Sequence, residues 1–455
     1  MSPRGRGFLG WDSYCAKRTG LFDGGGGSER VSTKEKKAGR SSDGRGAERI
    51  QRVSLMAIAA LLITMVGLVV GVIFRELRKK HVHLWIGSYC AQRLAGWRAR
   101  REAERQPLIH VLFCMVDHFE PISAGSTPEV ERDRMKDWLV RYPALACRHR
   151  DSNGRPVQHS WFYPGEAYHQ EYLDNLTDLC RQGFGEIELH LHHGHDNEET
   201  LARKIHHAVE LFGQHGALRT QWGQGRPVYG FIHGNMALDN SRHDPQYCGV
   251  NGELTVLRDT GCYADFSLPT APCESQSSMV NTIFYATDDP SKAKSFDRGE
   301  EVVLNGETTG DLMIVPGPLT FNWASRKWGL IPRIENGEIQ GSNPPTRDRV
   351  RLWVETHIHV KGRPEWVFVK VSCHGAEDRS RDALLGEAAD VMYEELECRY
   401  REGRYRLHYV TSREMYNIIK SAEAGKTGDP RQYYDFEIAP YRTHCLAVPQ
   451  EVLGL

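Results

Sequence analysis

The chain has 455 residues, of which 40% are hydrophobic and 26% are charged, and its formal net charge is −1. This length allows either several domains or one large α/β domain with appendages. A chain so close to neutral is not a polycation built for nucleic acid, so we expect no nucleic-acid partner.

The N-terminal part divides into a polar segment and an apolar segment. Residues 1–52 are rich in Gly, Ser, Arg and Lys and bury too little apolar surface to offset ordering entropy, which predicts disorder. Val53–Phe74 contains no charged residue, and at ~1.5 Å per residue it spans roughly 33 Å, about one hydrocarbon core. We therefore predict one transmembrane helix over 53–74 and a single-pass membrane protein. A signal peptide is the alternative, but its apolar core is usually shorter.

The segment that follows the apolar run is aromatic and basic. Residues 75–106 combine Trp85, Tyr89 and Trp97 with several arginines, a composition typical of a juxtamembrane segment at the lipid interface. A plain linker helix is the alternative. Basic residues flank the apolar run on both sides, so the positive-inside rule does not select an orientation.

From Pro107 onward, the pattern changes to alternating strands and helices. We expect strands over 109–116, 187–192, 228–232, 366–371 and 407–410, and helices that start near 128 and 196 or cover about 381–400 and 411–422. Such alternation predicts an α/β fold over 107–425, with a parallel sheet or a barrel. Residues from about 240 to 350 are richer in turns and are predicted to be insertions, and residues 426–455 a C-terminal tail.

Histidines follow the ends of four expected strands. In α/β folds the active site lies at the carboxyl ends of the strands, so these positions are the candidates for chemistry. Four such placements are hard to explain by packing alone. The strand-end residues are Asp117, His118, His190, His192, His195, His233, Asn235 and His374.

The histidines of the second motif have a spacing that suits a metal ion. His190 and His192 are two apart on a strand, so both imidazoles face the same side. His195 on the next turn and either Asp117 or His118 from the neighbouring strand are candidates for the remaining positions. We predict one divalent metal, with zinc as the first choice. Alternatively, individual histidines here donate hydrogen bonds to the metal ligands without binding the metal, or they cap a helix.

Other segments are candidates for contact with a substrate. His233 and Asn235 lie on a polar loop at a strand end and are predicted to bind substrate, although loop structure alone explains them equally well. Asp265 is predicted to orient a catalytic histidine. The tryptophans of the insertion region can stack on sugar rings or pack in the core, and we favour core packing; they are Trp323, Trp328 and Trp353.

The strand-end motifs resemble those of the polysaccharide deacetylases with NodB homology, the family-four carbohydrate esterases. The resemblance covers roughly residues 107–425 and implies a distorted (β/α) barrel with fewer than eight strands and a single divalent metal. In this chain, one transmembrane helix would precede the barrel. The motifs that carry the resemblance are Val116-Asp117-His118-Phe119-Glu120-Pro121, His190-Leu191-His192-His193-Gly194-His195-Asp196 and Phe368-Val369-Lys370-Val371-Ser372-Cys373-His374.

The resemblance also implies an activity and a role for each motif residue. The family removes N- or O-acetyl groups from a polysaccharide or cell-envelope glycan. Asp117 matches the general base of the family, and His374 matches the histidine that protonates the leaving amine. His118 stands where the family has a metal-binding Asp, while His190, His192 and His195 compete for the two metal-histidine places. A glycan substrate favours an exterior or periplasmic barrel and suggests partners in a glycan synthesis complex.

The motifs depart from the family pattern, and two other functions stay open. The chain has no Asp-Asp pair and no His-x-x-x-His spacing in these motifs. A glycoside hydrolase on a related barrel needs two carboxylates that flank the scissile bond, and Asp117 with Glu120 or Asp265 are candidates for that pair. The other alternative is a non-catalytic barrel that binds glycan or scaffolds a membrane complex.

Overall fold

The computed structural model describes residues 43–123 and 125–440. The chain divides into two units, Met1–Val69 and Val70–Leu455. Helix α1 (Asp43–Lys79) includes all described residues of the first unit and continues into the second. The predicted disorder over 1–52 falls largely outside the described residues, and residues 43–52 are helical in the structure.

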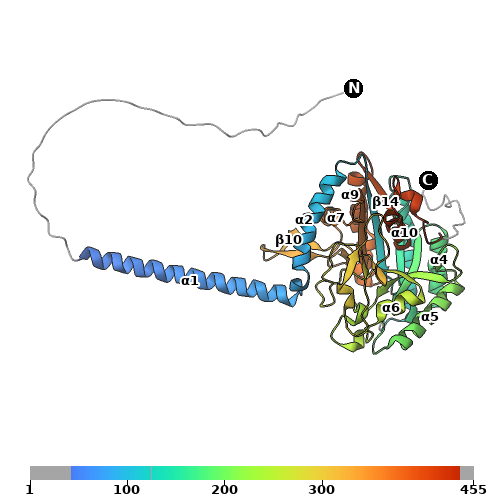
Figure 1. Ribbon diagram of the computed structural model, residues 1–455, viewed down its shortest axis with the longest axis horizontal. Helices are drawn as coiled ribbons and strands as arrows, with labels where there is room; N and C mark the ends of the chain where they lie inside the picture. Colours follow the sequence, from blue (N-terminus) through green and yellow to red (C-terminus); the bar gives the residue numbers. More distant parts are fainter. Residues whose placement is uncertain (1–42, 124, 441–455) are drawn as a thin grey trace, which may run out of the picture. The chain divides into compact units, whose positions relative to one another are not determined.

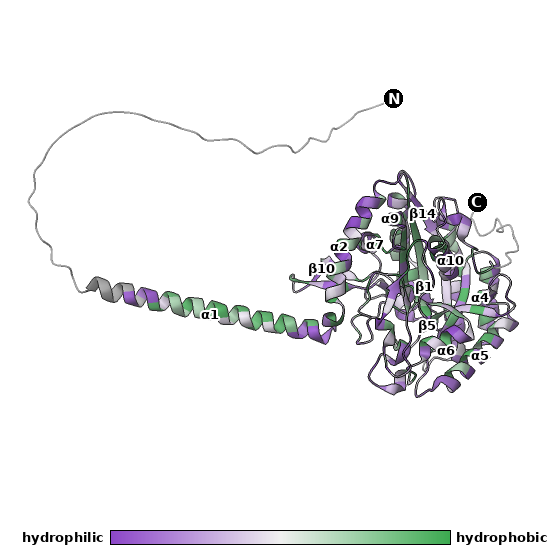
Figure 2. Ribbon diagram, in the orientation of Figure 1, coloured by the Kyte–Doolittle hydropathy of each residue, from purple (hydrophilic) through white to green (hydrophobic). Residues whose placement is uncertain are grey.

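Helix α1 contains the apolar run. By length and composition, Gln51–Lys79 is apolar enough to cross a membrane, and none of its most hydrophobic window is buried. Figure 2 shows the hydrophobic stretch with hydrophilic residues at both ends of the helix. The first unit therefore offers its apolar side chains to the surroundings rather than to a protein core, as a membrane span would.

The second unit is a mixed α/β structure built on a mostly parallel sheet (Figure 1). The strand order is β12-β13-β1-β2-β3-β5-β6-β9-β7-β8, with β14 paired to β1 and β4 paired to β5. The strands are β1 (Ile109–His118), β2 (His159–Pro164), β3 (Gly185–Leu191), β4 (Arg219–Thr220), β5 (Pro227–His233), β6 (Cys262–Asp265), β7 (Phe284–Ala286), β8 (Gly299–Glu301), β9 (Leu312–Ile314), β12 (Glu338–Ile339), β13 (Trp366–Cys373) and β14 (Tyr405–Tyr409). In the part of the chain described, these pairings form an open sheet, with no pairing between the end strands β12 and β8. They confirm the predicted α/β class.

Helices connect the strands and cover the sheet. The helices that lie between β1 and β13 in the chain serve as crossovers, which parallel pairing requires. Their bounds are α2 (Ile86–Ala103), α3 (Pro128–Arg148), α4 (Gln170–Arg181), α5 (Glu198–Gln214), α6 (Glu253–Thr260), α7 (Arg347–Thr356), α8 (Asp378–Leu385), α9 (Glu387–Tyr400) and α10 (Ser412–Glu423).

Strand β1 is buried along its whole length because apolar layers cover both of its faces. Phe113 and Met115 belong to the layer beneath α3, α4, α5 and α9, whereas Leu112 and Cys114 belong to the layer that includes α10. Alternate residues of a strand point to opposite faces, so a sheet covered on both sides needs a continuous apolar run. The same alternation decides which residues at the end of β1 can reach a common site.

The register of the strands brings the predicted motif ends to one edge of the sheet. Asp117 pairs with Cys373 on β13, and His190 pairs with Ile232 on β5. Because these strands are parallel, their carboxyl ends meet at the same edge. The loops that follow β1, β3, β5 and β13 therefore emerge close together.

Several predicted boundaries change in the structure. The helix expected over about 381–400 is two helices, α8 and α9, separated at Gly386. The helix expected to start near 196 is α5, which begins with a capping box between Asn197 and Thr200, since both reciprocal hydrogen bonds form there. The helix expected over 411–422 is α10, and its cap is Thr411, in a capping box with Glu414.

The predicted insertion region contains a separate two-stranded sheet. Strands β10 (Thr320–Lys327) and β11 (Ile331–Glu335) form a hairpin. The predicted core packing is right for Trp353, which is fully buried, and wrong for Trp323 and Trp328, which are 58% and 65% exposed. In the juxtamembrane segment, Trp85 is buried, whereas Trp97 is exposed.

Candidate active site

Four histidines and one glutamate meet at the carboxyl ends of β1, β3 and β13. We call His118, Glu120, His190, His192 and His374 the strand-end cluster. The His118 ring stacks on the His374 ring with 4.4 Å between centroids, and its edge meets His190 at 4.8 Å. The His190 and His192 rings are 4.6 Å apart. The structure thus brings together four of the predicted site residues and adds Glu120.

The hydrogen bonds of His190 leave one ring nitrogen facing a carboxylate. Nδ1 lies 3.0 Å from the carbonyl oxygen of Ile232. A carbonyl only accepts, so Nδ1 carries the proton and donates. Nε2 lies 3.1 Å from Oε1 of Glu120. In a neutral His190 both of these atoms are acceptors, so either a proton or a cation must lie between them.

Glu120 sits among the histidines and is only partly exposed. Burial raises the pKa of Glu120, but the hydrogen bond to His190 and the surrounding imidazoles outweigh burial and lower the pKa overall. Its Oε1 also lies 3.8 Å from Nε2 of His192. Glu120 is therefore an ionised carboxylate at neutral pH, in reach of two histidines.

Glu166 orients His192 from outside the strand-end cluster. Its Oε1 accepts from Nδ1 of His192 at 2.6 Å and from the His192 backbone N–H at 3.1 Å. Burial lowers the pKa of His192, yet the bond to Glu166 and the charges of Glu120 and Glu166 together outweigh burial and raise it. With Nδ1 committed to Glu166, Nε2 of His192 is turned toward Glu120. Metal-binding imidazoles commonly donate their other ring N–H to a carboxylate in this manner.

His118 and His374 contribute buried nitrogens without partners. The Nδ1 atoms of both rings are buried, and no described residue provides a hydrogen bond to either. Burial, with help from the neighbouring imidazoles, moves the pKa of His118 well below its ordinary value, so this ring is neutral. Buried polar atoms are nearly always paired, and neutral imidazole nitrogens are common metal ligands. The donor set therefore fits a divalent cation.

Asp117 points away from the strand-end cluster. Successive residues of a strand face opposite sides, so Asp117 and His118 diverge. Its Oδ2 lies 2.8 Å from Nε2 of His159, and its Oδ1 accepts from the backbone N–H of Gly375 at 2.6 Å. The carboxylate predicted as general base instead holds the backbone just after His374. A Cβ at Gly375 would lie only 2.1 Å from Oδ2 of Asp117, so this position requires glycine.

Two other predicted residues also lie outside the cluster. His195 is exposed, with a φ of 53°, and belongs to none of the groups of potential ligands among the described residues. Asp265 is buried and accepts from the backbone N–H and hydroxyl of Ser267 at 2.9 and 2.7 Å. The hydroxyl of Ser267 accepts in turn from the His233 backbone. Burial raises the pKa of Asp265 to about 7. Through Ser267, Asp265 therefore supports the backbone of His233 and does not orient an imidazole ring.

A second group of potential metal ligands lies next to the cluster. His193, His233, Cys248 and Glu253, which we call the buried cluster, are all buried. Oε1 of Glu253 lies 3.0 Å from Nε2 of His193, and its Oε2 accepts from the Cys248 thiol at 3.3 Å. His233, predicted to bind substrate, is enclosed here. The amide of Asn235 donates to backbone carbonyls of His193 and Tyr247, which makes it a structural residue.

Sequence patterns missed several of these residues. Glu166, Cys248 and Glu253 belong to segments without a histidine motif. Glu120 lay inside a motif but was assigned only to an alternative function. Glu166 follows a strand, β2, and its carboxylate at a strand end was the one signal available to find it.

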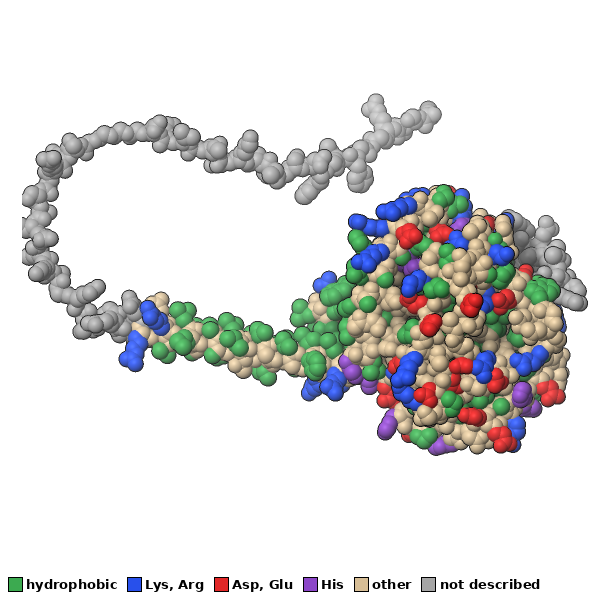
Figure 3. Space-filling model, in the orientation of Figure 1, with side chains coloured by type: hydrophobic (Ala, Val, Ile, Leu, Met, Phe, Trp, Pro, Cys, Tyr) green, Lys and Arg blue, Asp and Glu red, His purple; other side chains and the backbone are tan. Residues whose placement is uncertain are grey.

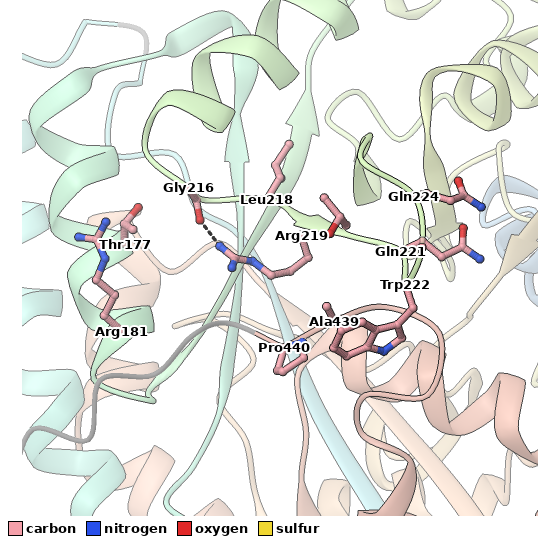
Figure 4. Close-up of a pocket in the computed structure, with 12 residues that line it drawn as sticks. Thr177, Arg181, Gly216, Leu218, Arg219, Gln221, Trp222, Gln224, Ala439 and Pro440 are labelled. Atoms are coloured by element: carbon pink, nitrogen blue, oxygen red, sulfur yellow. Dashed lines mark hydrogen bonds between the residues drawn. The ribbon is translucent and has the colours of Figure 1, made fainter.

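A cavity of about 570 Å³ lies elsewhere, and none of the predicted site residues lines it. Figure 4 shows Arg181 of α4, Arg219 of β4 and the side chain of Trp222 around this cavity. Trp222 is held by a hydrogen bond from its indole N–H to the carbonyl oxygen of Asp435. This cavity contains none of the titratable groups of the strand-end cluster, so we take the cluster as the candidate site.

A comparison with solved structures found a similarity for this chain. No protein-family model and no curated protein match this chain. A crystal structure from Parabacteroides distasonis, provisionally described as a glycoside hydrolase/deacetylase, matches over 70% of each chain, with 14% sequence identity and a TM-score of 0.39. Similarity at this level does not assign a function to the chain.

Proposed function

We propose that this chain is a membrane-anchored, metal-dependent hydrolase that removes acetyl groups from amino sugars of a polysaccharide or envelope glycan. The strand-end cluster carries the proposal, because it combines several imidazoles, a carboxylate and buried unpaired nitrogens at one edge of a parallel sheet. The motif resemblance supports acetylated sugars as the substrate class and a distorted barrel as the fold. The apolar run of α1 supports the anchor, and a glycan substrate favours an exterior site near glycan-synthesis partners.

Each residue of the cluster has a role in this proposal. His118, His190 and His192 would hold the metal, for which zinc is the first choice. Bound there, such an ion polarises a carbonyl oxygen and lowers the pKa of water. Glu120 takes the role of general base, because it is ionised and lies among the ligands, while Asp117 positions the backbone beside His374. His374 would protonate the leaving amine.

The carboxylate pairs considered for a glycoside hydrolase receive no support. Asp117 faces His159 on the far side of β1, and Asp265 is bonded to Ser267, so neither shares a site with Glu120. Glycosidic cleavage by two carboxylates requires both to flank one bond. We therefore keep hydrolysis of an acetyl group as the proposal.

The metal content of the purified full-length protein tests the proposal. We expect about one divalent ion per chain, lost in His190→Ala and kept in His207→Ala, because a site of this type needs about three protein ligands. His207 is a matched control, since it is exposed on α5 in the same histidine-rich stretch. The active protein should release acetate from N-acetylated amino-sugar oligomers.

A third variant separates the strand-end cluster from the buried cluster. In Cys248→Ser we expect the ion and the acetate release to persist, because Cys248 belongs to the buried cluster. Loss of the ion in Cys248→Ser but not in His190→Ala would place the metal in the buried cluster and contradict the assignment. A folded protein that takes up no ion after reconstitution would contradict metal dependence altogether.

A further inference from the structure

The hairpin of β10 and β11 exposes three large apolar side chains, two at its turn and one at the irregularity within β10. Trp323, Trp328 and Leu330 are 58%, 65% and 74% exposed. The two strands pair only with each other among the described strands, so the hairpin extends from the second unit beside α2 (Figure 1). Soluble surfaces carry single exposed apolar residues routinely, but a group of this size on one hairpin marks an interaction surface.

The turn of the hairpin places a tryptophan where glycine would be less strained. The backbone N–H of Leu330 donates to the carbonyl of Lys327 across the turn. Both central residues, Trp328 and Gly329, have positive φ, at 54° and 71°. This conformation favours Gly and Asn and is unusual for a bulky side chain. Backbone strain of this kind is concentrated at functional sites, so the conformation of Trp328 points to a role for its side chain.

The hairpin is attached beside the end of the apolar helix. Nζ of Lys327 lies 3.8 Å from Oε2 of Glu76, close to the last residue of α1. A small cavity of about 50 Å³ lies between Leu77 of α1 and Trp328 of the hairpin. At the base of the hairpin, the ring of Phe321 stacks on the ring of Trp85 with 5.4 Å between centroids. These contacts keep the tip next to the residues where the proposed span leaves the bilayer.

Basic groups accompany the exposed aromatic rings. Lys327 lies over the ring of Trp328 at 4.4 Å, and Arg326 lies 5.9 Å from the ring of Trp323. The neighbouring end of α1 adds Arg78 and Lys79. Tryptophans beside basic residues are the composition of the water–lipid boundary, where indole rings meet the headgroups and cations meet anionic lipid. Figure 3 shows the basic side chains at both ends of the apolar stretch.

We propose that the β10–β11 hairpin inserts its tip into the headgroup region of the bilayer beside α1. Trp323, Trp328 and Leu330 enter the boundary, and Arg326 and Lys327 face anionic headgroups. This inference rests on the anchor in the proposed function and adds a second membrane contact. That contact holds the second unit at the lipid surface.

Quenching of tryptophan fluorescence by brominated lipid tests this contact in the full-length protein. The protein is reconstituted in phosphatidylcholine–phosphatidylglycerol vesicles, with bromine placed just below the headgroups. The apolar run 53–74 contains no tryptophan, so the span itself gives no signal. We expect the quenched fraction to fall roughly twofold in the Trp323→Phe/Trp328→Phe variant, because these rings lie at the boundary. Trp222→Phe is the matched control, since Trp222 is 59% exposed and lies away from the hairpin.

The outcomes distinguish the hairpin from the anchor. Vesicle flotation of the protein with equal quenching in the double variant and in Trp222→Phe would overturn the hairpin contact and leave the anchor standing. Failure of the protein to float with vesicles would overturn both. Flotation with reduced quenching only in the double variant supports the hairpin contact.

Discussion

At the residue scale, the candidate site depends on which nitrogen of each histidine is free. His190 commits Nδ1 to the carbonyl of Ile232, and His192 commits Nδ1 to Glu166, so the Nε2 atoms of both turn toward Glu120. Such fixed tautomers prepare lone pairs for a cation. The supporting carbonyl and carboxylate are therefore as much a part of the site as the imidazoles are.

Replacement of Glu166 tests the support of His192. In Glu166→Gln the carboxylate that accepts from Nδ1 is lost, so we expect metal affinity to fall by about 10- to 100-fold. A competition titration with a chelating indicator measures the affinity. Glu171→Gln, an exposed position on the nearby helix α4, should leave the affinity unchanged. An unchanged affinity in Glu166→Gln would show that His192 does not depend on this bond.

Replacement of Asp117 distinguishes positioning from proton transfer. In Asp117→Asn an amide replaces one oxygen beside either the Gly375 N–H or His159, and we expect a loss of stability of about 1–3 kcal/mol, seen as a lower Tm. A general base in contact with substrate would lose activity at an unchanged Tm. That second result would return the role of general base to Asp117.

At the element scale, the loop after β13 is held against β1 by a glycine contact. A Cβ at Gly375 would lie 2.1 Å from the Asp117 carboxylate and 2.4 Å from the Trp138 ring, both of them buried. His374 immediately precedes this contact. The close approach of the two elements therefore sets where the His374 ring lies in the cluster.

Two glycine-to-alanine variants should have effects of opposite sign. Gly375→Ala forces the loop away from β1, and we expect a loss of folding stability of at least about 2 kcal/mol. Gly213→Ala lies within α5, where an added Cβ meets nothing within 4 Å, and should stabilise by about 0.5–1 kcal/mol. Thermal unfolding of the full-length protein in detergent measures both, and equal Tm values would contradict the predicted contact.

At the scale of the whole molecule, a second histidine pair lies at the opposite end of the sheet from the candidate site. Nδ1 of His110, at the start of β1, lies 2.9 Å from Nε2 of His408 on β14. Burial lowers the pKa of His110 to about 4, and burial with the neighbouring His110 lowers that of His408 to about 3. Both rings are neutral in the fold at physiological pH.

This pair predicts a loss of stability in acid. The unfolded histidines take up protons near pH 6.5, and the folded pair resists them until about pH 4, so stability present above pH 6.5 is lost as pH falls through this window. The loss for His110 is on the order of 3 kcal/mol. Thermal unfolding between pH 7.5 and 4 should show a shallower acid decline in His110→Gln than in the wild type or His207→Gln. Parallel curves would contradict the prediction.

The sequence by itself determined the class of the fold and the end of the sheet where the candidate site lies. The apolar run was visible because a span needs an unbroken stretch of about 20 apolar residues, and the strand-end histidines because motifs follow buried runs. Short strands such as β2 and the helices α4 and α7 went unrecognised. Their stability comes from packing against distant segments rather than from their own periodicity.

Only the tertiary structure decided which side chains share a site. Asp117 and His118 are neighbours in sequence, yet the alternation of the strand sends one to His159 and the other to the cluster. Glu166 reaches His192 because β2 lies beside β3, a pairing that local sequence does not encode. A motif names the residues near a strand end, but register and facing are set by packing between segments far apart in the chain.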